Sequence, residues 1–338
     1  MTRASVIGEL TLIDQIRRTF PKRNRFTTLG IGDDCAVLQP PKGHEILVTT
    51  DFSLEGRHFR RDLHPPTSAG HRCLARGLSD LAAMGAKPLA AFLSLAVPGS
   101  LLRTKRGQAW LDGFFTGIRE LATLHNTSLA GGDTSESPTD LIFADIVLIG
   151  SAPRGRSLRR STARPGDAIY VTGALGGAHA ELTSLLAANT LSRVTAQGDH
   201  PHFFPRPRLA TGATLLHRQL ATAVIDLSDG LSTDLTHICQ ASGLRAQIDA
   251  AALPFHPLTA KLASSDAFHA ALHGGEDYEL LFTASSSARV PKSIAGTPVT
   301  RIGTIHKAGG RWPRITLIER GGRRTPLTPG GWEHFTAR

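Results

Sequence analysis

The chain has 338 residues, and about half of them are apolar when glycine is counted and tyrosine is not, an ordinary share for a globular protein. This composition excludes an intrinsically disordered protein, and the length predicts two domains or one large one. The 38 Lys and Arg residues outnumber the 28 Asp and Glu residues, giving a formal net charge of +10. Such an excess favours a polyanionic partner, with nucleic acid as the first candidate.

No segment is predicted to cross a membrane or to direct secretion. The longest apolar stretch, residues 89–97, is interrupted by Ser94 and is far shorter than the ~20 residues that a membrane helix needs. The N-terminus lacks the apolar core of a signal peptide, which predicts a cytoplasmic protein. Cys35, Cys73 and Cys239 lie far apart, as is typical of reduced structural thiols rather than of a zinc site or a redox pair.

The first half of the chain alternates predicted helices and strands. Apolar residues recur at helical spacing over residues 6–19, at Val6, Ile7, Leu10, Ile13 and Ile16. The elements that follow are a strand over 46–50, a helix over 69–84, a strand over 90–97, a helix over 104–125 and a strand over 141–149. This order predicts a layered α/β domain.

Residues 152–166 are rich in Pro, Gly, Ser and Arg and separate two halves with different patterns. The predicted domains are therefore residues 1–152 and 153–338. The second half is expected to hold strands over 168–172, 222–227, 278–283, 298–305 and 314–319, with helices over 178–188 and 208–217. The pattern defines neither the strand order nor the direction of pairing.

Five short segments place aspartate at the end of an apolar strand or in a glycine turn. They are residues 30–34 (GIGDD), 49–51 (TTD), 78–80 (LSD), 131–134 (GGDT) and 225–230 (IDLSDG). Each segment alone is typical of a turn or a helix N-cap. Together they predict a divalent-metal and phosphate site, because Mg²⁺ is usually held by carboxylates, water and substrate phosphates.

The phosphate-binding loops of the common nucleotide folds are absent from the sequence. No Gly-x-x-x-x-Gly-Lys-Ser/Thr segment occurs, and Gly30-x-Gly32 lacks a third glycine, which excludes P-loop and Rossmann enzymes on motif grounds. After the predicted strand ending near Asp226, Asp229 precedes a helix whose N-terminus could meet an anion. The glycine turn at residues 173–177 is either a plain strand-to-helix connection or an anion-binding turn.

The aspartate segments are accompanied by residues 55–59 (EGRHF), 78–86 (LSDLAAMGA), 274–281 (GGEDYELL) and 331–335 (GWEHF), in one order over nearly the whole chain. In this combination the sequence resembles the thiamine-monophosphate kinase family, whose superfamily includes aminoimidazole ribonucleotide synthetase. The resemblance implies a two-domain, PurM-like α/β fold. Its N-terminal domain would bind ATP and several Mg²⁺ ions and pair into a homodimer, and its C-terminal domain would be a second α/β domain.

The resemblance also assigns roles residue by residue. The implied magnesium ligands are Asp33, Thr49, Thr50, Asp51, Asp80, Asp133, Asp226 and Asp229, with Asp51, Asp133 and Asp229 expected to be essential for catalysis. The implied ATP contacts are Gly132, Asp133, Arg160 and Ser228. His58 is expected at the phosphate of thiamine monophosphate, and Glu276 or Asp277 with Trp332 at its organic part, where an indole face suits a cationic thiazolium ring.

The sequence departs from the family pattern at three places near the expected nucleotide site. Gly77 stands where an Asn commonly precedes Leu-Ser-Asp, and Thr162 stands where a Gly is usual in Arg-Ser-Gly-Ala. Ser135, rather than Thr, follows Thr134. These changes spare the aspartates, so they concern the geometry of the nucleotide site and not the type of reaction.

The implied reaction moves the γ-phosphoryl group of ATP onto the phosphate of thiamine monophosphate, giving thiamine diphosphate. Because the second pKa of a phosphate monoester is about 6, the attacking oxygen needs no general base, and catalysis should rest on charge neutralisation and in-line positioning. One alternative is another ATP-using enzyme of the superfamily, similar to aminoimidazole ribonucleotide synthetase. The other is a non-enzymatic nucleic-acid binder, suggested by the arginines of residues 154–164 and the basic segment 311–324, although no known nucleic-acid module is present.

Overall fold

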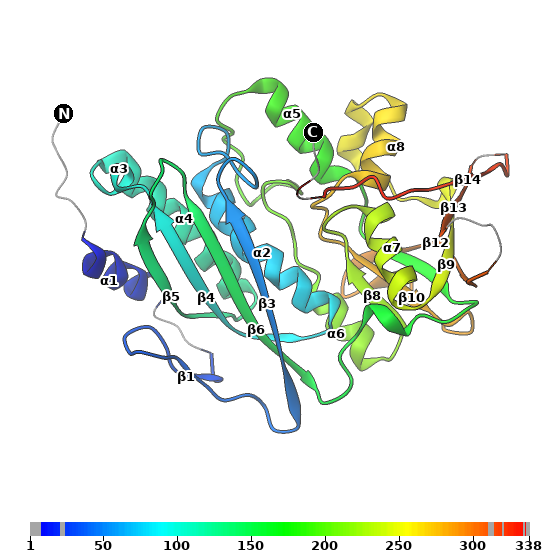
Figure 1. The fold of residues 1–338 in the computed structure, drawn as a ribbon, viewed down its shortest axis with the longest axis horizontal. Coiled ribbons are helices and arrows are strands. Elements are labelled where there is room, and N and C mark those ends of the chain that lie inside the picture. The colour runs from blue at the N-terminus through cyan, green and yellow to red at the C-terminus, as the bar shows by residue number, and fades with distance from the viewer. Residues whose placement is uncertain (1–7, 21–23, 310–313, 320, 334, 336–338) are drawn as a thin grey trace. The chain divides into compact units, whose positions relative to one another are not determined.

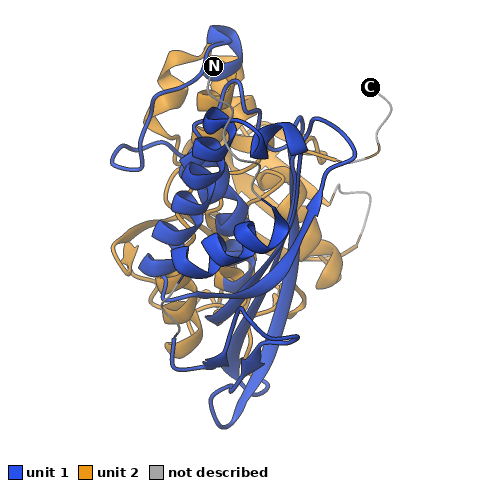
Figure 2. Cartoon of the chain, turned by 90° about the vertical axis from the view of Figure 1, so that its left-hand side faces the viewer, with its two compact units in different colours: residues 1–81, 87–155, 185–204 blue, residues 82–86, 156–184, 205–338 orange. Residues whose placement is uncertain are grey.

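The computed structural model describes residues 8–20, 24–309, 314–319, 321–333 and 335. Helices and strands follow one another along the chain (Figure 1), and contacts divide it into two compact units (Figure 2). Unit 1 consists of Met1–Leu81, Lys87–Gly155 and Leu185–Phe204, and unit 2 of Ala82–Ala86, Arg156–Ser184 and Pro205–Arg338. The main boundary between the two units, at residues 155 and 156, therefore lies near the predicted linker. Unit 1 also includes residues 185–204 of the second half, and unit 2 includes residues 82–86 of the first half. The domains 1–152 and 153–338 stay a prediction.

Unit 1 is built on a four-stranded sheet in the order β3-β6-β4-β5. Its strands are β3 (His44–Leu54), β4 (Lys87–Val97), β5 (Ser128–Glu136) and β6 (Phe143–Pro153). β6 runs antiparallel to both β3 and β4, whereas β4 and β5 are parallel. Shorter elements of this unit are α1 (Glu9–Thr19), β1 (Thr27–Leu29), β2 (Val37–Leu38) and α3 (Gly99–Leu102).

Helices α2 (Pro66–Ala83) and α4 (Lys105–Leu124) cover one face of this sheet (Figure 1). The apolar side chains of α2, α4 and the inner face of β6 are buried together, among them Leu74, Leu78, Phe114, Phe115, Ile146 and Leu148. Strand residues alternate between two faces, so the same strands present a second row of side chains to the other side. There Ile46, Val48 and Phe52 of β3 are exposed apolar residues.

Unit 2 contains an eight-stranded sheet in the order β14-β13-β9-β12-β7-β10-β8, with β11 paired to β12. Its strands are β7 (Ala168–Thr172), β8 (Ala223–Asp226), β9 (Leu244–Asp249), β10 (Leu280–Ala284), β11 (Ser293–Ile294), β12 (Thr297–Lys307), β13 (Ile315–Ile318) and β14 (Arg324–Pro326). The pairing is antiparallel except between β9 and β13. Its helical elements are α5 (Gly177–Ala188), α6 (Leu209–His217), α7 (Leu231–Ala241), α8 (Ser264–His273), η1 (Arg160–Thr162), η2 (Ala250–Ala252) and η3 (Pro257–Lys261).

The hydrophobic core of unit 2 lies between this sheet and helix α7. The inward residues of the strands, among them Ile169, Val171, Ile225, Ile248 and Leu281, pack on the apolar face of the helix, which includes Leu235, and are almost fully buried. Asp226 ends β8 within this core region and is itself only 3% exposed. The core therefore places a buried aspartate at the end of β8, an edge strand of the sheet.

Every helix and strand predicted by range from the sequence is present, with ends that differ by a few residues. The opening helix is described from Glu9, and Val6 and Ile7 lie outside the described residues. Strand β5 was not predicted, because its sequence SLAGGDTSE has neither alternation nor β-branched enrichment. It forms where its backbone pairs with β4. Among the described helices, none combines the length and apolarity needed to span a bilayer.

Candidate active site

The inner face of β3 and one face of α2 bring three of the predicted metal ligands together. Thr49 and Asp51 lie two residues apart on β3 and so point to the side that α2 covers. The Thr49 hydroxyl donates to the carboxylate of Asp80 on α2. One helical turn earlier, the Arg76 guanidinium lies 3.6 Å from a carboxylate oxygen of Asp51. A strand and a helix thus hold two acids and one cation in fixed positions.

This arrangement changes the proton affinity of Asp51. Burial raises the pKa of Asp51 from 3.8 to about 6. The positive charge of Arg76 opposes the shift, whereas the charges of Asp80 and Asp145 and a hydrogen bond with Asp80 add to it. Crowded, partly buried carboxylates of this kind are stabilised by a bound cation.

Thr50 points to the opposite face of the sheet, where a second acidic group lies. Its hydroxyl donates to the carboxylate of Asp145 on β6 at 2.7 Å. The strand register aligns Asp145 with Ser94 and Ser94 with Asp133, so the two acids lie on one face with a single strand between them, about 10 Å apart. The ligands predicted in unit 1 are therefore divided between the two faces of the sheet.

A pocket of about 730 Å³ lies beside this second group. Two glycine–aspartate segments line it, residues 30–36 and residues 131–134, together with apolar residues of α1 and β4. Gly132 has φ +149°, and a Cβ there would overlap the backbone of Leu93, so only glycine allows this strand to run so close to β4. The pocket brings Asp33, Gly132 and Asp133 together, as expected for residues that share one ligand. Its size is typical of small-molecule sites.

His58 lies in the loop between β3 and α2. Its Nδ1 accepts a hydrogen bond from the Leu54 amide at 2.9 Å. A neutral imidazole carries only one proton, so the proton of His58 must reside on Nε2. The proton of His58 therefore lies on Nε2, and an N–H donor of this kind suits a phosphate oxygen.

The second set of predicted residues converges in unit 2, around the turn that follows β8. The Glu276 amide donates to the Ser228 carbonyl at 2.8 Å, and the Trp332 amide donates to the Asp229 carbonyl at 3.1 Å. Gly331 lies so close to this turn that a Cβ would overlap the Asp229 carbonyl oxygen. Segments more than 40 residues apart in sequence thus meet at Ser228 and Asp229, and Asp226 ends the strand that leads into the turn.

A carboxylate that the sequence reasoning did not single out completes this cluster. Asp234 of α7 is 1% exposed and accepts hydrogen bonds from the amides of Asp229 and Gly230, each at 3.1 Å. Burial, followed by the charges of Asp226 and Asp229, raises its pKa well above the ordinary value. The side chains of Asp229, Asp234 and His237 each offer a ligand atom within 4.8 Å of the others.

Asp277 has a structural role in this unit. Its two carboxylate oxygens accept hydrogen bonds from the amides of Gly176 at 2.7 Å and Ala178 at 3.1 Å, at the N-terminus of α5. Burial raises the pKa of Asp277 to about 7, although these amides oppose the shift. The glycine turn at 173–177 is therefore a strand-to-helix connection whose anion is the protein's own carboxylate. Glu276 and Asp277 were both predicted to contact the organic part of the substrate, and of the two only Asp277 has this capping role.

The departures from the family pattern are accommodated locally. A Cβ at Gly77 would overlap a Leu148 methyl group, so the packing of α2 on β6 leaves no room for an Asn without a shift. Thr162 donates to the Thr222 carbonyl, which holds η1 to the start of β8. Arg160 is exposed on the same short element.

All the predicted ligands in the two clusters offer oxygen atoms, from carboxylates and threonine hydroxyls. Hard divalent cations such as Mg²⁺ prefer this donor set. The residues present therefore fit the magnesium ions that the sequence pattern implies. Sequence reasoning missed Asp145 and Arg76, and the signal was available for Asp145, because it is the only charged residue in the apolar strand β6.

Comparison with known proteins gives a consistent result. The family model described as AIR synthase related protein, N-terminal domain, matches residues 32–152, and the corresponding C-terminal domain model matches residues 164–309. The thiamine-monophosphate kinase of Escherichia coli (strain K12) is 40% identical over 307 residues, covering 88% of this chain and 90% of that protein. The enzyme of the same name from Synechococcus elongatus is 35% identical over 341 residues, covering 98% of each.

Solved structures extend this likeness to the fold. Thiamine-monophosphate kinase from Stenotrophomonas maltophilia K279a matches with a TM-score of 0.78 at 36% identity, covering 92% of this chain and 96% of that one. AaThiL complexed with AMPPCP and TMP matches with a TM-score of 0.72 at 28% identity, covering 99% of each. Hydrogenase maturation protein HypE in complex with ATP has a TM-score of 0.76 at 17% identity, covering 96% of this chain and 94% of that one, which indicates a common fold alone.

Proposed function

The chain belongs to the thiamine-monophosphate kinase family of AIR synthase related proteins, and from this premise we propose that it phosphorylates thiamine monophosphate with ATP. The products would be thiamine diphosphate and ADP. The observation that carries the proposal is the 730 Å³ pocket between two glycine–aspartate segments, which brings Asp33, Gly132 and Asp133 together. The structure of AaThiL with AMPPCP and TMP supports the choice of both substrates.

The chemistry suits a site with many acids. The second pKa of a phosphate monoester is about 6, so the attacking oxygen of thiamine monophosphate is largely deprotonated at neutral pH. The main obstacle is the repulsion between this phosphate and the triphosphate of ATP. The protein therefore needs to neutralise charge and to align the attacking oxygen with the γ-phosphorus and its leaving oxygen.

Each set of residues has a part in this proposal. His58 donates its Nε2 proton to the phosphate of thiamine monophosphate, and Glu276 and Trp332 contact the organic part. Gly132, Asp133, Arg160 and Ser228 bind ATP. Asp51, Asp133 and Asp229 are the acids whose loss should stop the reaction.

The magnesium ions would be held by Asp33, Thr49, Thr50, Asp51, Asp80 and Asp133 in unit 1, and by Asp226 and Asp229 in unit 2. When bound, Mg²⁺ neutralises phosphate charge and orients phosphate oxygens. The acids committed to metal leave the remaining surface more basic than the formal net charge of +10 indicates. Such a surface attracts two phosphorylated substrates and increases their association rate at low ionic strength.

We also propose that two copies of the chain pair through the outer face of the unit 1 sheet. Val48 and Phe52 are 63% and 61% exposed, and Ile46 lies in the same row of β3. Neighbouring β6 adds Val147 and Ile149, which the register places opposite Thr50 and Val48. An exposed apolar row of this kind is typical of a surface covered by a second copy. The use of ATP favours a cytoplasmic location.

The test is an assay of ADP release by the purified protein with Mg²⁺ and ATP, in the presence of thiamine monophosphate or of free thiamine. We expect turnover with thiamine monophosphate only. The variants Asp51→Asn and Asp229→Asn should lose turnover while keeping the wild-type circular dichroism spectrum. The control variant Asp62→Asn changes an exposed acid of unit 1 and should keep the wild-type turnover. Turnover by both of the first two variants near the wild-type rate would refute the assigned roles.

A further inference from the structure

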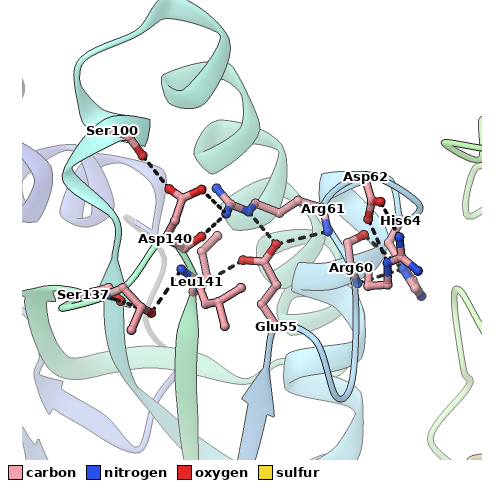
Figure 3. Close-up of polar contacts among 11 residues, drawn as sticks. Glu55, Arg60, Arg61, Asp62, His64, Ser100, Ser137, Asp140 and Leu141 are labelled. Carbon is pink, nitrogen blue, oxygen red and sulfur yellow. Dashed lines mark hydrogen bonds and ion pairs between the residues drawn. The ribbon is translucent and has the colours of Figure 1, made fainter.

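The loop that carries His58 is anchored at its first residue. This loop joins β3 to α2 and spans residues 55–65. The buried Glu55 carboxylate accepts hydrogen bonds from Arg61 Nε at 2.6 Å and from the Ile142 amide at 2.9 Å. Figure 3 shows this group, in which Arg61 also reaches Asp140, with a carboxylate oxygen 3.6 Å away. One side of the loop is thus attached to the segment that leads into β6.

The other side of the loop lies against the buried side chains of Arg72 and His202, and its own His64 is buried with them; the three are 2%, 1% and 3% exposed. Arg72 of α2 donates through Nη2 to the His58 carbonyl oxygen at 2.9 Å. Its Nη1 donates to the His202 carbonyl and lies 3.1 Å from His202 Nδ1. The Nε2 atoms of His202 and His64 are 3.0 Å apart.

The chemistry of the donor decides where the proton of His202 lies. A guanidinium can only donate, so Nδ1 of His202 accepts from Arg72, and the proton of this ring lies on Nε2. His202 Nε2 lies 3.0 Å from His64 Nε2, and His64 Nδ1 accepts a hydrogen bond from the Arg60 amide at 3.1 Å, with the Arg60 carbonyl oxygen 3.2 Å away. These contacts connect Arg72 through His202 and His64 to the backbone of the loop.

His202 comes from residues 185–204, which we call the bracing segment. This segment runs from the last turn of α5 toward α6, yet its contacts group with unit 1. The Ser192 amide donates to the Leu63 carbonyl, and the Ser68 hydroxyl donates to the Phe203 carbonyl, each at 2.9 Å. The bracing segment therefore contacts both the end of the His58 loop and the first turn of α2.

Helix α2 connects this loop to the acidic cluster. Arg72, Arg76 and Asp80 are spaced four residues apart and lie along one face of the helix. Over about 12 Å of helix they contact the His58 carbonyl, the Asp51 carboxylate and the Thr49 hydroxyl in turn. A rigid helix of this kind fixes the distance between His58 and the acids.

We propose that Arg72 and His202 are positioning residues for thiamine monophosphate. They fix the His58 backbone so that its Nε2 donor is held where the substrate phosphate binds, at a set distance from the acids of β3 and α2. This inference rests on the proposed function, in which His58 binds that phosphate. The loop is then already ordered when the substrate binds, so binding does not lose the conformational entropy of ordering it.

The test compares three substitutions in the bracing segment. His202→Leu removes both ring hydrogen bonds and should raise the KM for thiamine monophosphate about tenfold, while the KM for ATP stays at the wild-type value. His202→Asn keeps an acceptor near the position of Nδ1 and should recover most of this loss. Gln197→Leu changes an exposed residue of the same segment and is the matched control. Should His202→Leu fail to fold, His202→Gln, which lacks the Nδ1 acceptor, carries the same expectation.

Hydrogen exchange of the peptide over residues 55–64 gives a readout that is independent of activity. Exchange should be faster in His202→Leu than in His202→Asn, Gln197→Leu or the wild type. An unchanged KM for thiamine monophosphate in His202→Leu, or equal impairment of the Leu and Asn variants, overturns the bracing role. His58→Ala separates the two proposals, because an unchanged KM in that variant refutes the substrate role of His58 itself and the inference with it.

Discussion

Replacing Asp51 by Asn should make the metal-free protein more stable while stopping its reaction. The ordinary pKa of 3.8 rises to about 6 because the carboxyl is partly buried and lies beside Asp80 and Asp145. At about 1.4 kcal/mol per pKa unit, an ionised Asp51 destabilises the folded state by about 3 kcal/mol. This shift already includes the attraction of Arg76, and because the carboxyl is partly exposed to solvent the expected net gain in stability is about 2 kcal/mol.

The sign of this effect depends on pH. The folded protein holds the Asp51 proton more tightly than the unfolded chain does, so the destabilisation is absent below about pH 4, grows as the pH rises and is complete above about pH 6. The advantage of the Asn variant should therefore be largest near pH 8 and should shrink to about half near pH 5. Mg²⁺ should stabilise the wild type more than the variant, because it binds the folded carboxylate.

Thermal melting in EDTA, at both pH values, measures this difference. A gain of about 2 kcal/mol corresponds to a rise of about 5 °C in melting temperature at pH 8. The matched control is Asp62→Asn, whose exposed carboxylate has a lowered pKa because Arg60 donates hydrogen bonds to it, so that variant should show no gain. A melting temperature for Asp51→Asn at or below the wild-type value at pH 8 would refute the claim that the acids of this cluster repel one another.

Three further predictions address other parts of the account. His58→Ala should raise the KM for thiamine monophosphate at least tenfold with little change for ATP, because it removes one hydrogen bond to a charged phosphate, and steady-state kinetics with each substrate varied in turn would check it. Asp277→Ala should lower the free energy of unfolding by about 2 kcal/mol, because the amides of Gly176 and Ala178 lose their acceptor. Asp277→Asn should lower it by less, and urea titrations of the two variants measure the difference. Phe52→Asp should convert a dimer into a monomer, because it places a charge on the exposed apolar face of β3. Light scattering after size exclusion measures the mass, and a variant that is still a dimer would contradict the proposed interface.

The sequence predicted most of the periodic elements, because burial of one face imposes a period on the apolar residues, but the alternating strand β9 was missed. Strand β7 was predicted with the observed ends, and α2 and α4 to within a few residues. Strand β5 had no such period, since the pairing of its backbone with β4 decides its structure. The strand order of the two sheets depends on contacts between distant segments, which no local pattern contains.

In the candidate site, too, local sequence patterns were predictive and contacts between distant segments were not. The recurring aspartates indicated a metal and phosphate site, and alternation along β3 already implies that Thr50 points away from Thr49 and Asp51. The capping role of Asp277 was not predictable, because its partners lie about 100 residues earlier in the chain. The contact between His202 and Arg72 is equally remote in sequence, so the bracing segment had no signal beyond its histidine and proline content.

The central claim is that the γ-phosphoryl group of ATP moves directly onto the phosphate of thiamine monophosphate. Phosphorus NMR with ATP whose non-bridging γ-oxygens carry ¹⁸O follows that group through the reaction. We predict thiamine diphosphate whose terminal phosphate holds all of the label in non-bridging positions and whose bridging oxygen, supplied by thiamine monophosphate, is unlabelled. Label in the bridging oxygen, or labelled inorganic phosphate with no thiamine diphosphate, would contradict the account.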